Sequence, residues 1–110
     1  MNGNTKTTDP TELRRDIRLL EDTLRRQLDA HKQLLACVER NREAVRRADM
    51  QQIRSVCEEQ NTVAQGLAEL EKIRLTLVGR LTERLEPDAQ QPLSLSRIAA
   101  ELDEPASGRF

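Results

Sequence analysis

Residues 10–65 decide the fold, and they read PTELRRDIRLLEDTLRRQLDAHKQLLACVERNREAVRRADMQQIRSVCEEQNTVAQ. After the opening proline this stretch contains neither proline nor glycine, and its helical pattern continues to residue 86. Apolar residues recur three and four positions apart, which places them in one stripe along a helix and leaves charged residues on the other side. The stripe consists of Leu13, Ile17, Leu20, Leu24, Leu28, Leu35, Val38, Met50, Ile53, Val56, Val63, Leu67, Leu70, Leu77, Leu81 and Leu85.

We expect the chain to bury this stripe in an all-α fold, a long antiparallel helical hairpin that resembles a coiled coil, with a short third helix near the C-terminus. Charged residues make up 34% of the chain and aromatic residues 1%, with Phe110 the only aromatic side chain. A core without aromatics must be built from Leu, Ile, Val and Ala, which suits a helical bundle better than a sheet. The absence of Trp and Tyr also argues against a deep ligand pocket, since aromatic side chains usually line such pockets.

The charge pattern favours a solvated surface over a nucleic-acid site. The chain has 18 basic and 19 acidic residues, interspersed, for a net charge of −1. Arg-Arg pairs at 14–15, 25–26 and 46–47 could bind phosphate, but Glu21, Asp22 and Glu43 each stand four positions before such an arginine, in the order that favours a helical ion pair. Neither nucleic acid nor an anionic membrane is therefore expected as a partner.

We expect no secretion signal in this protein. Residues 1–9 are polar, without the apolar stretch of a signal peptide, and no membrane-spanning segment follows. We therefore expect a cytoplasmic protein without membrane insertion, in which residues 1–8 form a disordered tail. Asp9 can cap a helix whose first residue is Pro10, and Glu12 completes a capping box.

The helical hairpin is predicted to span residues 9–86, with its turn near residues 47–49. Two arginines, at 46 and 47, suit the negative end of a first helix, and Asp49 can cap a second helix that begins at Met50. No glycine or proline enforces a break here. A single continuous helix to Glu86, about 115 Å long and in need of a partner chain, therefore stays open as an alternative.

Residues 87–110 are predicted to form a linker, a short amphipathic helix over 94–102 and an irregular tail. Pro87 ends the second helix, because it disfavours helical backbone at the residue before it. Ser94 can cap the short helix, and Leu93 and Ile98 occupy the two positions of a hydrophobic staple. The apolar residues of this helix share one face, which consists of Leu95, Ile98, Ala99 and Leu102.

Candidate chemical groups are few, and we predict no catalytic, cofactor-binding or metal-binding residue. His31 is the only histidine and interrupts the apolar stripe, as a polar register position or a partly buried side chain would. Cys37 and Cys57 would lie nearly level in a hairpin, so a disulfide is conceivable, although reduced apolar fillers are favoured in a cytoplasm. Gly66 and Gly79 each cost a helix about 1 kcal/mol relative to alanine, which a closely packed neighbouring helix or simple tolerance would explain.

Four segments resemble one family. They are LLACVERNREAVRRADM at 34–50, EEQN at 58–61, LAELEKIR at 67–74 and LSLS at 93–96. In this order they are similar to the FlgN-type flagellar export chaperones, where a Leu-rich helix, a short charged turn with an aspartate and a second helix with spaced leucines precede a short helix. The resemblance covers roughly residues 10–102.

The resemblance implies a cytoplasmic chaperone of flagellar type III secretion, without enzymatic activity. Such chaperones bind hook–filament junction proteins (hook-associated proteins), keep them unassembled and deliver them to the export apparatus. They are helical hairpins that bind the client through a C-terminal helical surface, and a short helix beside a hairpin can form a groove for a client helix. Family members usually continue beyond the short helix, so this chain is expected to be a short member or shortened relative to its relatives. The matching partner-binding residues here are Leu93, Leu95, Ile98, Ala99 and Leu102.

Two other functions remain open from the sequence. A structural coiled-coil or adaptor protein could form a homodimer through the same apolar stripe. An Arg-rich nucleic-acid binder is the third hypothesis, and retention on DNA or RNA that disappears at ~0.2 M salt would count against specific binding.

Overall fold

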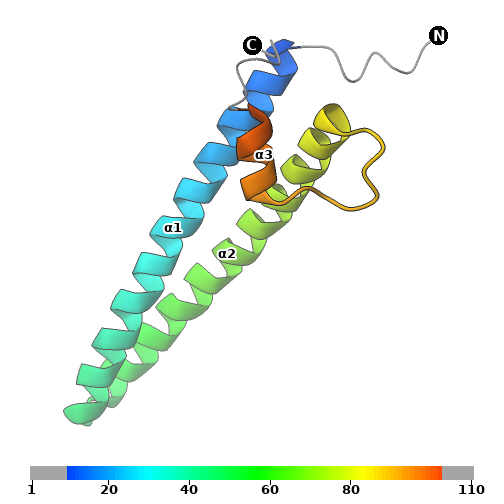
Figure 1. Cartoon of the computed structure of the whole chain (residues 1–110). Coiled ribbons are helices and arrows are strands. Elements are labelled where there is room, and N and C mark those ends of the chain that lie inside the picture. The colour runs from blue at the N-terminus through cyan, green and yellow to red at the C-terminus, as the bar shows by residue number, and fades with distance from the viewer. Residues whose placement is uncertain (1–9, 103–110) are drawn as a thin grey trace. The chain divides into compact units, whose positions relative to one another are not determined.

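The computed structural model describes residues 10–102, which form three α-helices (Figure 1). Helix α1 spans Pro10–Arg46, α2 spans Met50–Leu85 and α3 spans Leu95–Leu102. No strand occurs in this part of the chain, so the all-α prediction is confirmed. The alternative of one continuous helix is wrong, because α1 ends at Arg46 and α2 runs back antiparallel to it. The predicted tails, residues 1–8 and 103–110, lie outside the described residues.

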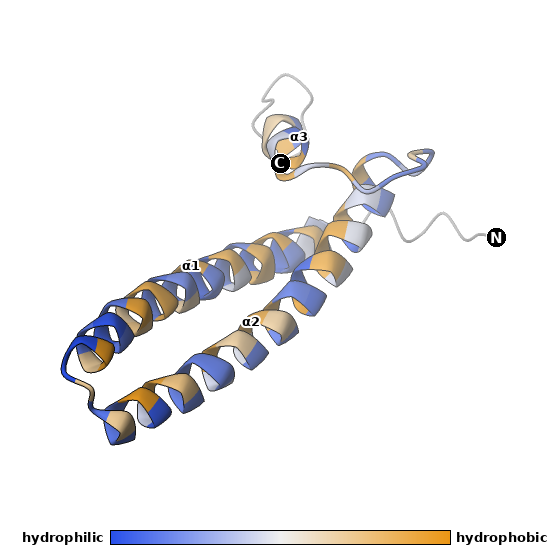
Figure 2. Cartoon of the chain, turned by 90° about the horizontal axis from the view of Figure 1, so that it is seen from below, coloured by the Kyte–Doolittle hydropathy of each residue, from blue (hydrophilic) through white to orange (hydrophobic). Residues whose placement is uncertain are grey.

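Two compact units divide the chain. We call residues 1–22 and 74–110 the terminal unit, and residues 23–73 the turn unit. The described part of the terminal unit contains the start of α1, the end of α2, the linker and α3. The turn unit contains the rest of α1 and α2 with the connection between them, and Figure 2 shows hydrophobic and hydrophilic residues alternating along both helices.

The connection between α1 and α2 is a helix cap that leads directly into the next helix. Ala48 adopts the left-handed conformation, with φ of 57°. Its amide donates to the carbonyl of Val45 at 3.0 Å, and the amide of Asp49 donates to the carbonyl of Ala44 at 2.9 Å, which is the hydrogen-bond pattern of a Schellman motif. The Asp49 carboxylate then accepts a hydrogen bond from the amide of Gln52 at 3.0 Å. The predicted cap and turn are thus confirmed, and α1 ends one residue earlier than predicted.

The connection to α3 is also fixed by local rules. Pro87 follows α2, and the amide of Ala89 donates to the carbonyl of Glu86 at 3.0 Å to close a turn around it. Ser94 caps α3 as predicted, because its hydroxyl accepts from the amide of Arg97 at 3.1 Å. The staple between Leu93 and Ile98 stays a prediction.

The terminal unit buries large apolar side chains from all three helices. At most 6% of each of these side chains is exposed, and together they are Leu20, Leu77, Val78, Leu81 and Ile98. An eight-residue helix cannot bury its own side chain, so other parts of the unit cover Ile98. Burial of one such side chain stabilises the fold by roughly 1.5–3 kcal/mol, and α3 is therefore part of this core.

The turn unit buries smaller residues than the sequence predicts. From α1 its seam contains Thr23, Ala30, Cys37 and Ala44, each at most 9% exposed. Larger predicted core residues on α1 are instead exposed, with 55% for Leu28, 68% for Leu35 and 41% for Val38. On α2, Met50 is likewise 61% exposed. The prediction that these four belong to the core is wrong.

The physical reason is a change of phase along α1. Leu13 and Leu20 are seven residues apart and share one side of α1, on which Leu20 is buried, and nearby Asp16 pairs with Arg80 and Arg84 of α2. From Leu20 the apolar stripe advances by four residues twice, to Leu24 and Leu28, and Leu35 follows seven residues later. Two successive steps of four rotate the stripe around the helix, away from the side that is buried. The stripe has helical spacing before and after this rotation, so the sequence pattern alone does not show which part of it is buried.

Candidate binding surfaces

The five predicted partner-binding residues do not share one environment. Ile98 is buried at 3% exposure, Leu93 and Leu102 are half-buried, and Leu95 and Ala99 are exposed. These burial levels follow the helix geometry, because Ile98 and Ala99 lie at opposite edges of the apolar face of α3. One edge of the face therefore packs within the terminal unit while the other edge meets solvent. A partner can reach Leu95 and Ala99 directly, whereas Ile98 anchors the helix.

Polar contacts hold α3 and its linker in place. The amide of Leu93 donates to the Thr82 hydroxyl on α2 at 2.9 Å. Arg97 forms an ion pair with Glu86 at the end of α2, and a second one with Glu101, one turn further along α3, at 3.2 Å. These contacts position the exposed edge of α3 next to the end of α2.

A buried ionic cluster within the terminal unit was not predicted. Asp16 on α1 has no exposed surface, and its carboxylate lies 2.8 Å from Arg84 and 3.4 Å from Arg80, both on α2. Arg84 also pairs with Glu12 at 3.0 Å. The available signal was spacing, since Asp16 lies four positions before Leu20 in the row that faces α2. The cluster ties the beginning of α1 to the end of α2.

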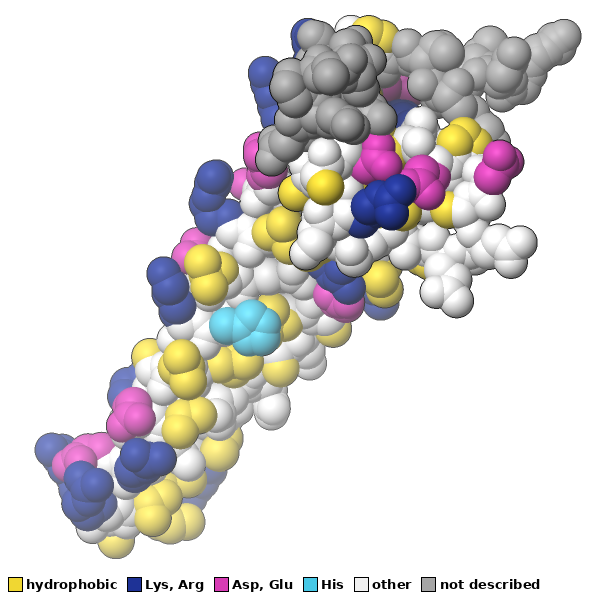
Figure 3. Space-filling view, in the orientation of Figure 1, with side chains coloured by type: hydrophobic (Ala, Val, Ile, Leu, Met, Phe, Trp, Pro, Cys, Tyr) yellow, Lys and Arg dark blue, Asp and Glu magenta, His cyan; other side chains and the backbone are white. Residues whose placement is uncertain are grey.

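An exposed apolar row follows α1 through the turn unit. We call Leu24, Leu28, His31, Leu35, Val38 and Val45 the outer row. Their spacing places them on one side of the helix. Four of them are large and well exposed, with Val45 at 58% beside the values given above, and Leu24 is half-buried. Figure 3 shows hydrophobic side chains along this face, with the histidine among them. His31 is exposed, so the expectation of a partly buried histidine is wrong.

Basic residues border the outer row on the side away from α2. Arg25 and Lys32 follow Leu24 and His31 in the sequence, are exposed, and make no ion pair within residues 10–102. Figure 3 shows a column of Lys and Arg side chains beside the hydrophobic ones. Glu39 continues this border, but it lies 3.7 Å from Arg42 and is thereby partly neutralised. From Arg25 to Glu39 the border therefore carries a net positive charge, and exposed Glu21 lies just before it.

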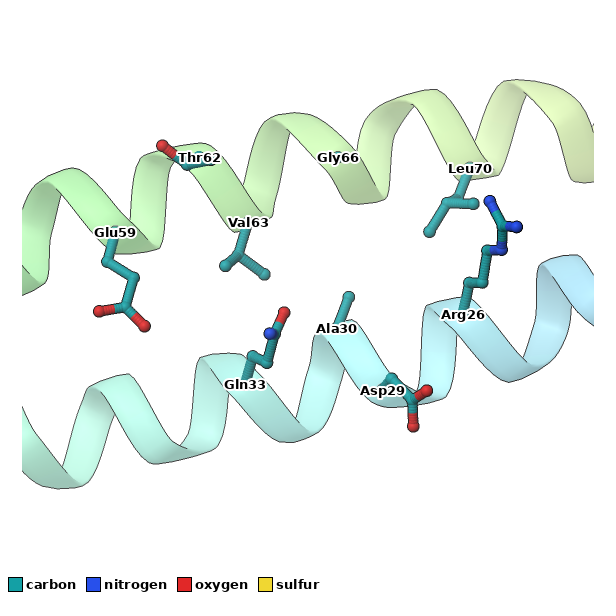
Figure 4. A pocket seen from close by; sticks show the side chains of 9 residues that line it. All are labelled: Arg26, Asp29, Ala30, Gln33, Glu59, Thr62, Val63, Gly66 and Leu70. Carbon is teal, nitrogen blue, oxygen red and sulfur yellow. The ribbon is translucent and has the colours of Figure 1, made fainter.

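A shallow groove of about 480 Å³ lies on the side of the turn unit's helix pair that is away from the outer row. In Figure 4, Ala30 points from α1, and Val63 and Leu70 point from α2, into the space between the helices, and Gly66 lies between Val63 and Leu70 on α2. A methyl group added to Gly66 or Gly79 would meet no atom within 4 Å. Close helix packing therefore explains neither glycine in the described structure. The polar residues that line the groove are Arg26, Asp29, Gln33, Glu59 and Thr62.

One ion pair crosses the turn unit near this groove. Arg40 on α1 donates to the carboxylate of Glu59 on α2 at 2.6 Å, and also to the sulfur of Cys37 at 3.3 Å. The hydrogen bond from Arg40 lowers the pKa of Glu59, and the same bond raises the pKa of Arg40. Gln27 adds a second crossing contact, because its amide donates to the carboxylate of Glu71 at 3.0 Å.

The remaining candidate groups do not form a chemical site within residues 10–102. Cys37 and Cys57 are free thiols, and only Cys37 is buried, so the filler prediction holds for Cys37 and is wrong for exposed Cys57. The predicted helical ion pair of Glu43 is confirmed, at 3.0 Å from Arg47. The one predicted between Glu21 and Arg25 is wrong, because Arg25 makes no ion pair within the described residues. No group of three potential metal ligands occurs in the described residues. None of the described helices is both long and apolar enough to cross a membrane.

Comparison with known proteins gives one match. The model of the family described as FlgN protein matches residues 17–108, which is most of the chain and includes both surfaces described above. No curated protein and no solved structure matches the chain significantly.

Proposed function

Because the chain belongs to the FlgN family, a family of flagellar export chaperones, we propose that it binds hook–filament junction proteins in the cytoplasm and keeps them competent for export. The family match over residues 17–108 is the observation that carries this proposal. It agrees with the resemblance of the helices, the charged turn and the Leu-Ser-Leu-Ser segment to that family.

The client-binding surface is the exposed edge of α3. Leu95 is 38% exposed and Ala99 is exposed beside it, with half-buried Leu93 and Leu102 next to them. An amphipathic client helix could extend the apolar face that Ile98 begins within the core. Covering a client's own apolar helix would keep it from assembling, and release would take place at the export apparatus. The mechanism requires no bond-making step.

The test is co-elution of the full chain with the hook–filament junction proteins of the same organism, followed by sizing with light scattering. We expect a discrete complex for the native chain. Ala99→Asp should weaken the complex at least tenfold, because it places a charge in the apolar contact. The matched control is Ala100→Asp, which makes the same change at an exposed position off the apolar face of the same helix.

Two results would contradict the proposal. A folded native chain that forms no complex with any hook–filament junction protein would remove the assigned clients. A complex that Ala99→Asp and Ala100→Asp weaken equally would remove the assigned surface. Ile98 is left unchanged in these experiments, because a charge at this buried position would disturb the packing of α3 itself.

A further inference from the structure

The outer row of α1 is an apolar surface that the chain does not use for its own core. Leu28, Leu35, Val38 and Val45 are between 41% and 68% exposed, while the seam beside them buries Ala30, Cys37 and Ala44. A helix that exposes its larger apolar residues and buries its smaller ones in this way marks an interaction surface.

The spacing of the row fits a helix. Its members recur three and four residues apart from position 24 to position 38, and Val45 follows seven residues later, which gives a length of roughly 30 Å at 1.5 Å per residue. An apolar row with this period packs against another helix in the manner of a coiled coil. A strand would not match it, because strand side chains repeat every two residues.

The neighbouring side of α2 leaves room for such a helix. The groove residues, among them Glu59, Thr62 and Gly66, lie on one side of α2. The helical repeat places Cys57, Ala64 and Ala68 on the other side, toward the outer row. Cys57, Ala64 and Ala68 are exposed and small, so a partner helix could lie along the outer row and rest against this side of α2.

The charges around the row specify the partner. Arg25 and Lys32 border it without an ion pair in the described chain, and Arg54 stands on the α2 side, also exposed and without such a pair. Two copies of the chain joined through this row in antiparallel fashion about His31 would bring Lys32 against Lys32, which is unfavourable. The same arrangement would bring Arg25 near Glu39, whose charge Arg42 already partly neutralises. Acidic residues beside the apolar face of a partner helix would complement these three cations.

We propose that the outer row binds an amphipathic helix of another protein whose apolar residues recur three and four apart and whose flanking residues are acidic. The surface goes beyond the proposed function, because it lies in the turn unit and does not use α3. The full chain can therefore engage two helices, one at each surface.

The experiment uses two labelled model peptides of about 21 residues, with the same leucines at a heptad spacing and either Glu or Lys at the flanking positions. The label is required because the chain has neither Trp nor Tyr. Fluorescence anisotropy with the full chain should show at least tenfold tighter binding of the Glu peptide, with an affinity that falls as salt is added. The double variant Arg25→Glu/Lys32→Glu should reverse the preference.

Leu35→Asp should weaken binding of the Glu peptide at least tenfold, because it introduces a charge in the middle of the row. The matched control is Ile73→Asp on α2, which removes a 48% exposed apolar side chain elsewhere in the turn unit. Circular dichroism verifies that each variant remains helical.

Several outcomes would overturn the proposal. These are equal binding of the two peptides, no binding of the Glu peptide by the native chain, or equal loss in Leu35→Asp and Ile73→Asp. A dimer that dissociates on Leu35→Asp and is not displaced by the Glu peptide would show that a second copy occupies the row. Failure of client co-elution with normal peptide binding would contradict only the proposed function.

Discussion

Asp16 is fully buried between two arginines of α2, and its nearest ion pair, with Arg84, is 2.8 Å long. Removing one partner of a buried ion pair leaves the other charge without its counterion, at a cost of about 3–5 kcal/mol. Arg84 retains Glu12 and is 13% exposed, which places the cost for Asp16→Ala near the lower limit, about 3 kcal/mol. Urea unfolding followed by far-UV circular dichroism measures this difference.

The control for Asp16 is Asp29→Ala, which removes a carboxylate from an exposed position on the same helix. Its effect should stay within about 0.5 kcal/mol, as for most surface substitutions. A loss below about 1 kcal/mol for Asp16→Ala would mean that the cluster contributes little to the stability of the terminal unit.

Glu59 gives the turn unit a dependence on pH. Its pKa in the folded chain is lowered by the hydrogen bond from Arg40, below an ordinary value of about 4.5. The resulting stabilisation is therefore complete above pH ~4.5 and is lost as the pH falls through the lower, folded pKa. The native chain should melt at a higher temperature than Glu59→Gln at pH 7, by a small margin because both groups are exposed.

The same comparison in acid tests the sign of this effect. The difference in melting temperature between the native chain and Glu59→Gln should shrink as the pH is lowered below 4.5. Arg40→Gln should show the same loss, and the double variant should add little to either single one. A difference that grows in acid would contradict the assignment.

Ala48 occupies a left-handed position that glycine usually fills at the end of a helix. This conformation destabilises a residue with a Cβ by roughly 1–2 kcal/mol, and glycine avoids that cost. Part of the gain is lost, because the greater freedom of glycine in the unfolded chain favours unfolding. Ala48→Gly should therefore stabilise the chain, by about 1 kcal/mol. Thermal unfolding provides the measurement.

Ala36→Gly is the matched control, since Ala36 lies within α1 and is exposed. There the same substitution should destabilise the chain by about 1 kcal/mol. Opposite signs at the two positions would support the cap geometry, whereas destabilisation at both would show that residue 48 does not need a left-handed backbone.

The ends of the helices could be predicted because they follow local rules. Asp49 and Ser94 cap the helices that follow them, and Pro87 lies just beyond the end of α2, as the sequence indicates. The buried seam could not be predicted in the same way, because exposed Leu35 and buried Cys37 both belong to rows with helical spacing. The choice between them depends on which side of α1 meets α2, and this is a property of the packed pair.

The candidate surfaces show the same limit. The sequence predicts the apolar face of α3, but not that Ile98 alone among its four residues is buried. It also does not identify Asp16, whose partner Arg84 is 68 positions away. Most residues of the outer row belong to the apolar stripe that the sequence shows, yet their exposure to solvent follows only from the structure.

The two units bury different amounts of large apolar side chain, and this should appear in their dynamics. The terminal unit buries Leu77, Val78 and Leu81 close together on α2. In the turn unit α2 buries Val56, and α1 buries chiefly Ala30 and Ala44 with a cysteine and a threonine. Regions with fewer buried apolar contacts open locally at a lower free energy. We expect amide hydrogen exchange to be faster over residues 30–45 than over residues 77–82.

Binding at the outer row should then change this profile selectively. The Glu peptide covers apolar side chains of the turn unit, so it should slow amide exchange over residues 30–45. The size of this effect should increase with the ratio of the free peptide concentration to its Kd. Exchange over residues 77–82 should change less, and Leu35→Asp should remove the effect. If both regions exchange at one rate and slow together, the chain opens only as a whole, and the lower stability assigned to the turn unit is wrong.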